Sequence, residues 1–342
     1  MSSFILPRNL LLLSSSSRRS SVYATRWFSA QPETLPPTKP AFLENWEQEK
    51  QRTRIEEKDQ LDASSFNLMG NCLNDPIYHH DRFPSHGTSI PQGWHLAYFP
   101  PRCPESDLSP DGYEQDWKPP SPFNHRMWAG GKLRWNPKNK LRVGQEATMV
   151  SRLDHVHWLP EGQRGDTVFT TVDKTIGNDN GWSIIESRSW AFTKDQDAQA
   201  IKRSNKKPVV AQDILDNPDF TFSWTPSPML LFRFSALTFN SHLIHYDQDY
   251  ARNVEHQSDC LVHGPLSLVW MLNTLHRHLK KVDTNKYIES FDYRCHRPLV
   301  VRQPLVVGGK QRSDNFGDYD IWVLDAEGKV AVHGVAAVGF SL

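Results

Sequence analysis

The sequence predicts an α+β fold in which an antiparallel sheet wraps around one buried helix. Four segments between residues 126 and 193 alternate apolar and polar side chains, as antiparallel strands do, with Gly, Asn and Asp between them. A segment that begins at Gly264 is apolar on nearly every side in its first half, as expected of a helix enclosed by other elements. Further strand-like segments follow it. At 342 residues, the chain can bury a substantial core in one large or two medium domains.

The composition excludes several classes of protein. Lys plus Arg and Asp plus Glu both total 39, so the formal charge is zero, which argues against binding to nucleic acid or to an anionic membrane. No apolar run approaches the roughly 18 residues of a membrane helix, so no span is expected. The four cysteines form no CxxC pair, which favours free thiols over a disulfide framework.

Residues 1–32 have the composition of a mitochondrial transit peptide. They contain no Asp or Glu, several arginines and many serines, and near their end "RWFSA" resembles a processing site near Phe28 or Ser29. A secretory signal is the alternative, but its apolar core would be only the short run from Leu10 to Leu13. We therefore expect the protein in the mitochondrial matrix.

Residues 33–122 are expected to form no compact domain of their own. A Pro-rich linker comes first, and the highly charged residues 42–62 are predicted to form a solvated helix. Residues 71–122 are rich in Pro, Gly, Asp and His and are predicted to be irregular, since segments of this length without regular structure are usually functional or wrapped over a domain. Their aromatic side chains indicate that this segment packs against the fold.

Two further segments are predicted to form the sheet and its helix. Residues 123–200 would contain the first four strands, and the polar residues 194–209 would mark the boundary to a second unit over residues 201–342. In the second unit we expect a strand at residues 230–239, with Ser235 as an ordinary member, and a short helix at residues 247–254. The buried helix carries leucines at 4-3-4 spacing: Leu268, Leu272, Leu275 and Leu279. The last strands are predicted at residues 287–295, 299–307, 319–328 and 329–340.

The stretch "FNSHLIHYD" places Asn240, His242 and His245 in apolar surroundings. Such groups cost free energy when buried unless they are hydrogen-bonded, so they are either satisfied structural residues or a reaction site. The spacing from His242 to His245 and Asp247 could also suit a metal ion, but no fourth ligand is evident.

These residues carry a resemblance to a known family. "NSHLIHYD" and "HGPL" resemble the MaoC-like hydratases and dehydratases of the hotdog fold, above all the mitochondrial 3-hydroxyacyl-thioester dehydratase type 2 group and its mesaconyl-C4-CoA hydratase-like relatives. "RMWAGGKL", "IPQGWHLAYF" and "LSPDGYEQDW" are similar to that group too, so the resemblance covers roughly residues 42–342. It implies a double hotdog whose first half is degenerate and shapes an acyl tunnel for a catalytic second half. Asn240 stands where these hydratases carry Asp.

The resemblance implies dehydration of (3R)-3-hydroxyacyl thioesters to trans-2-enoyl thioesters in mitochondrial fatty-acid synthesis. His245 would take and return protons, since imidazole titrates near neutral pH. Backbone N–H groups at the helix start, Gly264, would hold the enolate oxygen, because they lack intrahelical partners. Asn240 would orient the water or the 3-hydroxyl, and His242 is the alternative assistant. His263 and Pro265, on either side of Gly264, are expected to contact the substrate.

The carrier is expected to be CoA or acyl carrier protein, and no cofactor or metal is predicted. Its phosphate requires cationic or N–H donors at the tunnel mouth. Lys310 and Arg312 in the Gly-rich "GGKQRSDN", read as a loop, are the preferred pair among the late cations, which also include Arg294, Arg297 and Arg302. We expect a monomeric pseudo-dimer or a homodimer.

Two other functions remain open. A hotdog thioesterase would release free CoA, although it usually needs a carboxylate that Asn240 does not supply. A non-catalytic protein that binds acyl chains would turn over no thioester.

Overall fold

The computed structural model describes residues 38–162, 165–194, 210–313 and 317–340. The predicted transit peptide and the polar boundary segment at residues 195–209 lie outside these ranges. Within the described residues, no helix has both the length and the apolar character needed to cross a bilayer.

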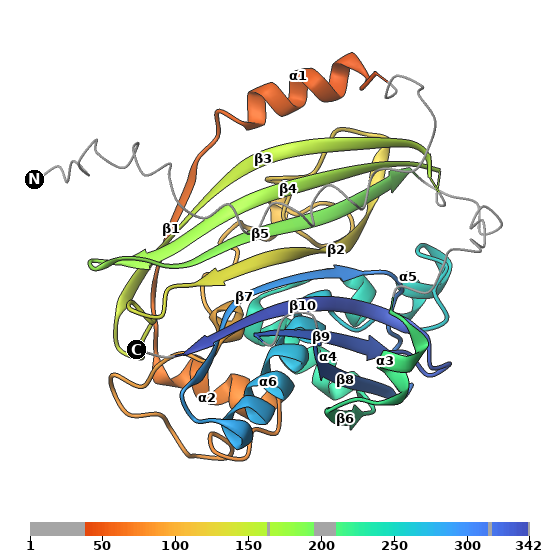
Figure 1. Ribbon diagram of the computed structural model, residues 1–342. Helices are drawn as coiled ribbons and strands as arrows, with labels where there is room; N and C mark the ends of the chain where they lie inside the picture. Colours follow the sequence, from red (N-terminus) through yellow and green to blue (C-terminus); the bar gives the residue numbers. More distant parts are fainter. Residues whose placement is uncertain (1–37, 163–164, 195–209, 314–316, 341–342) are drawn as a thin grey trace, which may run out of the picture. The chain divides into compact units, whose positions relative to one another are not determined.

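The described strands form one antiparallel sheet of ten, in the order β1-β3-β4-β5-β2-β7-β10-β9-β8-β6 (Figure 1). The first five are β1 (Ile55–Gln60), β2 (Phe123–Trp135), β3 (Glu146–Gly162), β4 (Gly165–Asn178) and β5 (Gly181–Lys194). The second five are β6 (Phe220–Trp224), β7 (Lys286–Cys295), β8 (Leu305–Gln311), β9 (Asp318–Leu324) and β10 (Val330–Phe340). Pairing of β2 with β7, from Gly130 opposite Arg294 to Arg134 opposite Ser290, joins the two halves. This is the double hotdog predicted from the sequence.

The buried helix is α6 (Gly264–Val282), and its position confirms the prediction. It packs against strands of the second half, β6 to β9, and also touches β2. Leu268, Leu272, Leu275 and Leu279 are all buried, which accounts for their 4-3-4 spacing. The first-half strands and α1 (Ala41–Lys50) enclose a second, smaller core around Trp117, Phe123 and Trp190.

The predicted strand at residues 230–239 is wrong, because this segment forms α4 (Pro228–Thr238). Ser227 caps the helix, its Oγ accepting from the N–H of Leu230 (3.2 Å), and Pro228 occupies the first turn, where its missing N–H costs nothing. Leu230, Leu231, Phe234 and Ser235 are buried at helical spacing. A short apolar run does not by itself distinguish a strand from a helix.

Other elements differ from the predictions in extent. The helix predicted over residues 42–62 ends at Lys50, and residues 55–60 instead form β1, which pairs with β3 and has alternate side chains partly buried. Helix α2 (Ala63–Cys72), the short α3 (Gln212–Asp216) and β6 were not predicted. The predicted strand at 299–307 begins only at Leu305, after Pro304, and Gly308 to Gln311 belong to β8 rather than to a loop.

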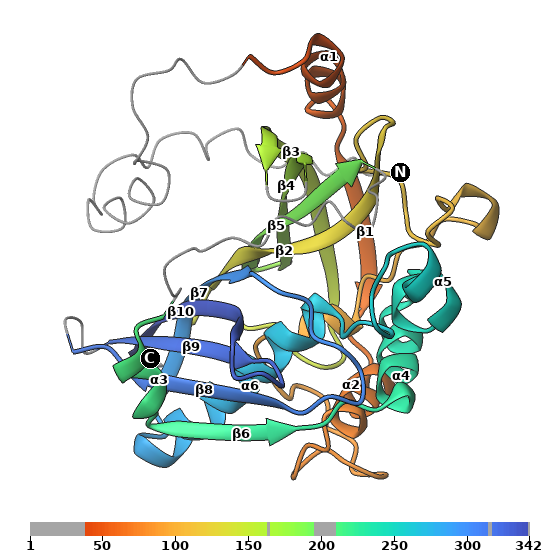
Figure 2. The same cartoon turned by 90° about the vertical axis from the view of Figure 1, so that its right-hand side faces the viewer.

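The segment between α2 and β2 contains only the short 3-10 helices η1 (Trp94–Ala97) and η2 (Glu105–Asp107). As expected, its aromatic side chains pack down: Trp94, Tyr98, Phe99 and Trp117 are buried. Helix α2 packs on α4, next to α5 (Gln248–Asn253), which is the helix predicted at residues 247–254 (Figure 2). The 3-10 helix η3 (Leu243–His245) contacts both α4 and α5.

Candidate active site

The loop between α4 and α5 carries the polar residues that the sequence singled out. Helix α4 ends at Phe239, which adopts a left-handed conformation (φ 51°), and the N–H of Asn240 donates to Ser235 O (2.9 Å). Asp247 caps α5, its carboxylate accepting from the N–H of Tyr250 (2.9 Å). The loop is therefore fixed at both ends, which holds η3 and His245 in place.

His245 is held in one tautomer. Its Nδ1 lies 2.8 Å from Leu261 O, and since a carbonyl can only accept, Nδ1 must carry the proton. In the neutral ring, Nε2 then has a free lone pair. Burial lowers the pKa of His245 to about 4, although the bond to Leu261 O acts in the opposite direction. His245 is therefore a neutral imidazole at neutral pH, ready to accept a proton.

The ring of His263 stacks on the ring of His245. The two rings stack with centroids 3.6 Å apart and planes 20° from parallel. His263 is fully buried, its Nε2 lies 2.8 Å from Ser235 Oγ, and burial lowers its pKa well below the usual value. His263 does not line the cavity, so the geometry does not favour its predicted contact with substrate. Its stacking instead fixes the plane of the His245 ring. Ser235 can reach His263 because it lies on helix α4 and not, as predicted, on a strand.

Asn240 and His242 complete the cluster. The N–H of His242 donates to Asn240 Oδ1 (3.0 Å), so the amide nitrogen of Asn240 is the end that can serve a ligand. The rings of His242 and His245 meet edge to face, with centroids 5.5 Å apart. Burial lowers the pKa of His242 well below its usual value, with His245 and Arg126 adding to the effect.

Gly264 places the start of α6 directly against Trp128 of β2. A Cβ on Gly264 would lie 2.6 Å from Cγ and 2.7 Å from Cβ of Trp128. Trp128 is itself fixed, since its Nε1–H donates to Tyr293 OH (2.7 Å) and its ring packs edge to face on Trp190 (centroids 5.5 Å apart). The first turn of α6, with N–H groups that lack intrahelical partners, thus faces the seam between the two halves.

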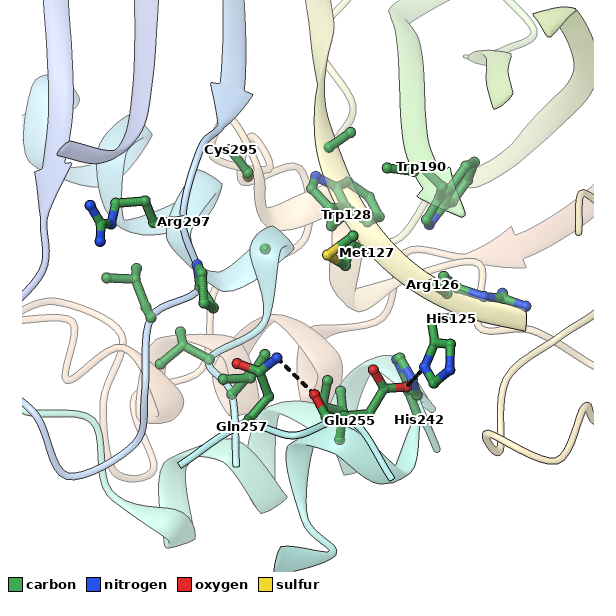
Figure 3. Close-up of a pocket in the computed structure, with 18 of the residues that line it drawn as sticks. His125, Arg126, Met127, Trp128, Trp190, His242, Glu255, Gln257, Cys295 and Arg297 are labelled. Carbon is green, nitrogen blue, oxygen red and sulfur yellow. Dashed lines mark hydrogen bonds and ion pairs between the residues drawn. The ribbon is translucent and has the colours of Figure 1, made fainter. Parts of the chain in front are cut away.

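A cavity of about 340 Å³ opens at this seam. The predicted residues Asn240, His242, His245, Gly264 and Pro265 all line it. The first half contributes an apolar wall that includes Met127, Trp128 and Trp190 (Figure 3). Leu159 and Phe169 belong to the same wall. The cavity therefore combines a neutral base, a helix N-terminus and an apolar wall.

The cations at the cavity differ from the preferred pair. Arg294 and Arg297 line it, whereas Lys310 and Arg312 do not. Lys310 belongs to β8, and Arg312 pairs with Asp320 (Nε to Oδ2, 3.7 Å).

The lining residues that were not predicted include His125, Arg126 and Glu255. Figure 3 shows His125 of β2 paired with Glu255 (3.1 Å) across the cavity. The similarity of "RMWAGGKL" to the family was a signal for Arg126, but periodicity offered none for the other two.

Comparison with known proteins identifies the family. The model of the hydroxyacyl-thioester dehydratase type 2 family matches residues 93–301, so the chain belongs to this family. Mesaconyl-C(4)-CoA hydratase of Chloroflexus aurantiacus is 32% identical over 75% of this chain and 86% of its own length. The mitochondrial hydroxyacyl-thioester dehydratase type 2 of Schizosaccharomyces pombe is 26% identical over 64% of this chain and 77% of its own. A MaoC-like dehydratase from Phytophthora capsici shares the fold, with a TM-score of 0.61 and 15% identity over 86% of this chain and 97% of that one.

Proposed function

We propose that the protein catalyses the reversible dehydration of (3R)-3-hydroxyacyl thioesters to trans-2-enoyl thioesters. The observation that carries the proposal is the neutral His245, with Nε2 available, beside the N-terminus of α6 in one cavity. Membership of the dehydratase family and the names of the relatives support the same reaction.

One imidazole suffices for the chemistry. His245 Nε2 takes the proton from C2, and the charge that develops on the thioester oxygen is held at the N–H groups of the first turn of α6. The electron pair from C2 forms the C2–C3 double bond as the C3–O bond breaks. The leaving hydroxyl takes the proton from the His245 imidazolium and departs as water, which returns His245 to its neutral form. Asn240, which cannot ionise, orients the hydroxyl through its amide nitrogen.

The purified protein without its leader tests this proposal. Mixed with a trans-2-enoyl-CoA, it should consume enoyl absorbance as water adds, without releasing free CoA. Absence of hydration over several chain lengths by folded protein would contradict the proposal.

The pH dependence follows from the lowered pKa of His245. The base must be neutral to accept a proton, and a lowered pKa keeps it neutral at more acidic pH. The value of kcat/KM should therefore be constant from about pH 8 to about pH 5 and should fall below about pH 5. The midpoint should lie near 4 rather than near the ordinary value of about 6.5. The measurement is kcat/KM across this range, with circular dichroism at each pH to exclude unfolding. A midpoint near that of free histidine would contradict the assignment of His245.

The cavity also indicates where each part of the substrate lies. We infer that the apolar wall of β2 to β5 receives the acyl chain, so the first half shapes the tunnel without supplying the base. Arg294 and Arg297 also line the cavity, and we infer that they bind the phosphate of CoA or of acyl carrier protein. We further propose the mitochondrial matrix as the compartment and fatty-acid synthesis as the process, supported by the acid-free leader and by the mitochondrial relatives.

Replacing Arg294 and Arg297 together by Gln should raise KM for acyl-CoA more than it lowers kcat, because they would hold a part of the substrate that does not react. The matched control replaces Lys310 and Arg312 by Gln. If the control pair raises KM and the first pair does not, the phosphate binds at the end of β8, as the sequence suggested.

A further inference from the structure

Three buried polar side chains lie close together beside the cavity without forming good hydrogen bonds to one another. They are Asp111, from the segment before β2, Arg126 of β2 and His242, and each is only 5–6% exposed. Asp111 Oδ2 lies 3.5 Å from Arg126 Nε and 3.8 Å from His242 Nε2. These separations are too long for good hydrogen bonds. Among the described residues, Asp111 Oδ2, Arg126 Nε, Arg126 Nη2 and His242 Nε2 have no hydrogen-bond partner.

The position of Asp111 is fixed by the loop of the site itself. The N–H of Leu243 donates to Asp111 O (2.9 Å), and Ser241 Oγ donates to Gly112 O (2.5 Å). Gly112 has φ +81°, and a Cβ there would lie 2.3 Å from Ser241 O, so only glycine allows the two segments to lie this close. The carboxylate is therefore built into the wall of the site.

Asp111 and Arg126 are each held by one side-chain atom, while other atoms of the same groups stay unpaired. Asp111 Oδ1 accepts from Ser109 Oγ and from the N–H of Tyr113 (3.2 Å), leaving Oδ2 for Arg126 and His242. Arg126 is anchored through Nη1, which donates to Glu114 O (2.9 Å), and its guanidinium lies 4.3 Å from the centre of the Tyr113 ring. Unpaired buried polar groups cost free energy, so a set of them that converges indicates a bound partner.

The charges at the cluster indicate a neutral partner. The carboxylate of Asp111 and the guanidinium of Arg126 offset each other, and burial keeps His242 uncharged at neutral pH. A water molecule fits these requirements, since it can donate to Asp111 Oδ2, accept from Arg126 and bond His242 Nε2. Buried waters make about three hydrogen bonds in polar sites of this kind. The 3.8 Å separation of Asp111 Oδ2 from His242 Nε2 lies in the range where a bridging water is expected.

We propose that Asp111, Arg126 and His242 bind one water molecule at the wall of the cavity, and that this water supplies the hydration reaction and receives the water that dehydration releases. Arg126 and His242 line the cavity, and the N–H of His242 holds Asn240, so the site adjoins the amide that would orient the reacting water. Asp111 is then a positioning residue that acts through the water. This role rests on the proposed function, whereas the water site itself does not.

The Asp111→Asn variant tests the role of the water. Asn preserves the shape of the side chain but can replace Oδ2 by an amino group, which cannot accept from Arg126 or from water. We expect kcat for enoyl-CoA hydration to fall about tenfold or more, with KM changed less than about threefold, because the water and not the thioester loses its contact. Asp116→Asn, an exposed carboxylate of the same segment, is the matched control and should match the wild type. An unchanged kcat in folded Asp111→Asn would overturn the role.

A high-resolution crystal structure of the wild-type protein tests the site without any variant. A water within hydrogen-bond distance of Asp111 Oδ2 and of at least one of the other two groups supports the proposal. Direct hydrogen bonding of Asp111 to Arg126 or His242, with no water between them, would overturn it. A wild-type protein that hydrates no enoyl thioester would contradict the proposed function and the role of this water, while the crystal structure would still decide whether the site exists.

Discussion

Replacing His245 by Ala should abolish most of the enoyl-CoA hydration activity. In the one-base mechanism His245 both takes and returns the proton, and general acid–base catalysis of this kind contributes about 10²- to 10⁴-fold. The free energy of unfolding should fall only by the contribution of the hydrogen bond to Leu261 O and of the stacking on His263. No large packing loss is expected, because the His245 ring is partly exposed to the cavity. The measurements are kcat and KM for hydration, together with the melting temperature.

His256→Asn is the matched control. His256 also lines the cavity, but it is exposed and has φ +53°, a conformation that Asn tolerates well. This variant should keep near wild-type kcat. If His245→Ala retains turnover while His242→Ala loses it, the base is His242 and the assignment is wrong.

Replacing Gly264 by Ala should be nearly as damaging, for a steric reason. The new Cβ would lie within 2.7 Å of Trp128 atoms, a separation that real Cβ atoms do not show. Trp128 cannot turn away easily, because its Nε1–H is bonded to Tyr293 OH and its ring is packed on Trp190. The start of α6 must therefore move from β2, which displaces the N–H groups at the cavity.

We expect a loss of about 1–3 kcal/mol in the free energy of unfolding, as for other overpacked buried sites, and at least about a hundredfold loss in kcat, the effect of removing an oxyanion donor. Denaturant unfolding and hydration kinetics measure the two effects separately. A variant with wild-type kcat would show that the first turn of α6 does not hold the developing charge.

The sequence predicted the features that depend on long, regular patterns. Helix α6 was predictable because its leucines, from Leu268 to Leu279, recur over about three turns and Pro265 marks its start. The strands of the first half were predictable because apolar and polar residues alternate along them. Helix α4 was missed because a ten-residue apolar run suits a strand and a buried helix equally. Strand β1 was missed because nearly all its side chains are polar or charged, so its residue types do not alternate. Only the burial alternates, with every second side chain partly buried.

The site was predictable only where its residues are close in sequence. Asn240, His242 and His245 lie in one loop, and Gly264 was found through its motif. The stacking of His263 on His245, the bond from Ser235 to His263 and the approach of Asp111 to His242 depend on tertiary packing between distant segments. The cations that line the cavity depend on how β7 pairs with β2, which no local pattern reveals.

The most direct test of the central claim is hydration of a trans-2-enoyl-CoA by the wild-type protein in ¹⁸O-labelled water, with the product analysed by mass spectrometry. The mechanism at His245 predicts one ¹⁸O atom in the C3 hydroxyl of an intact (3R)-3-hydroxyacyl-CoA. Label in a free carboxylate, accompanied by released CoA, would instead reveal thioester hydrolysis and contradict the account.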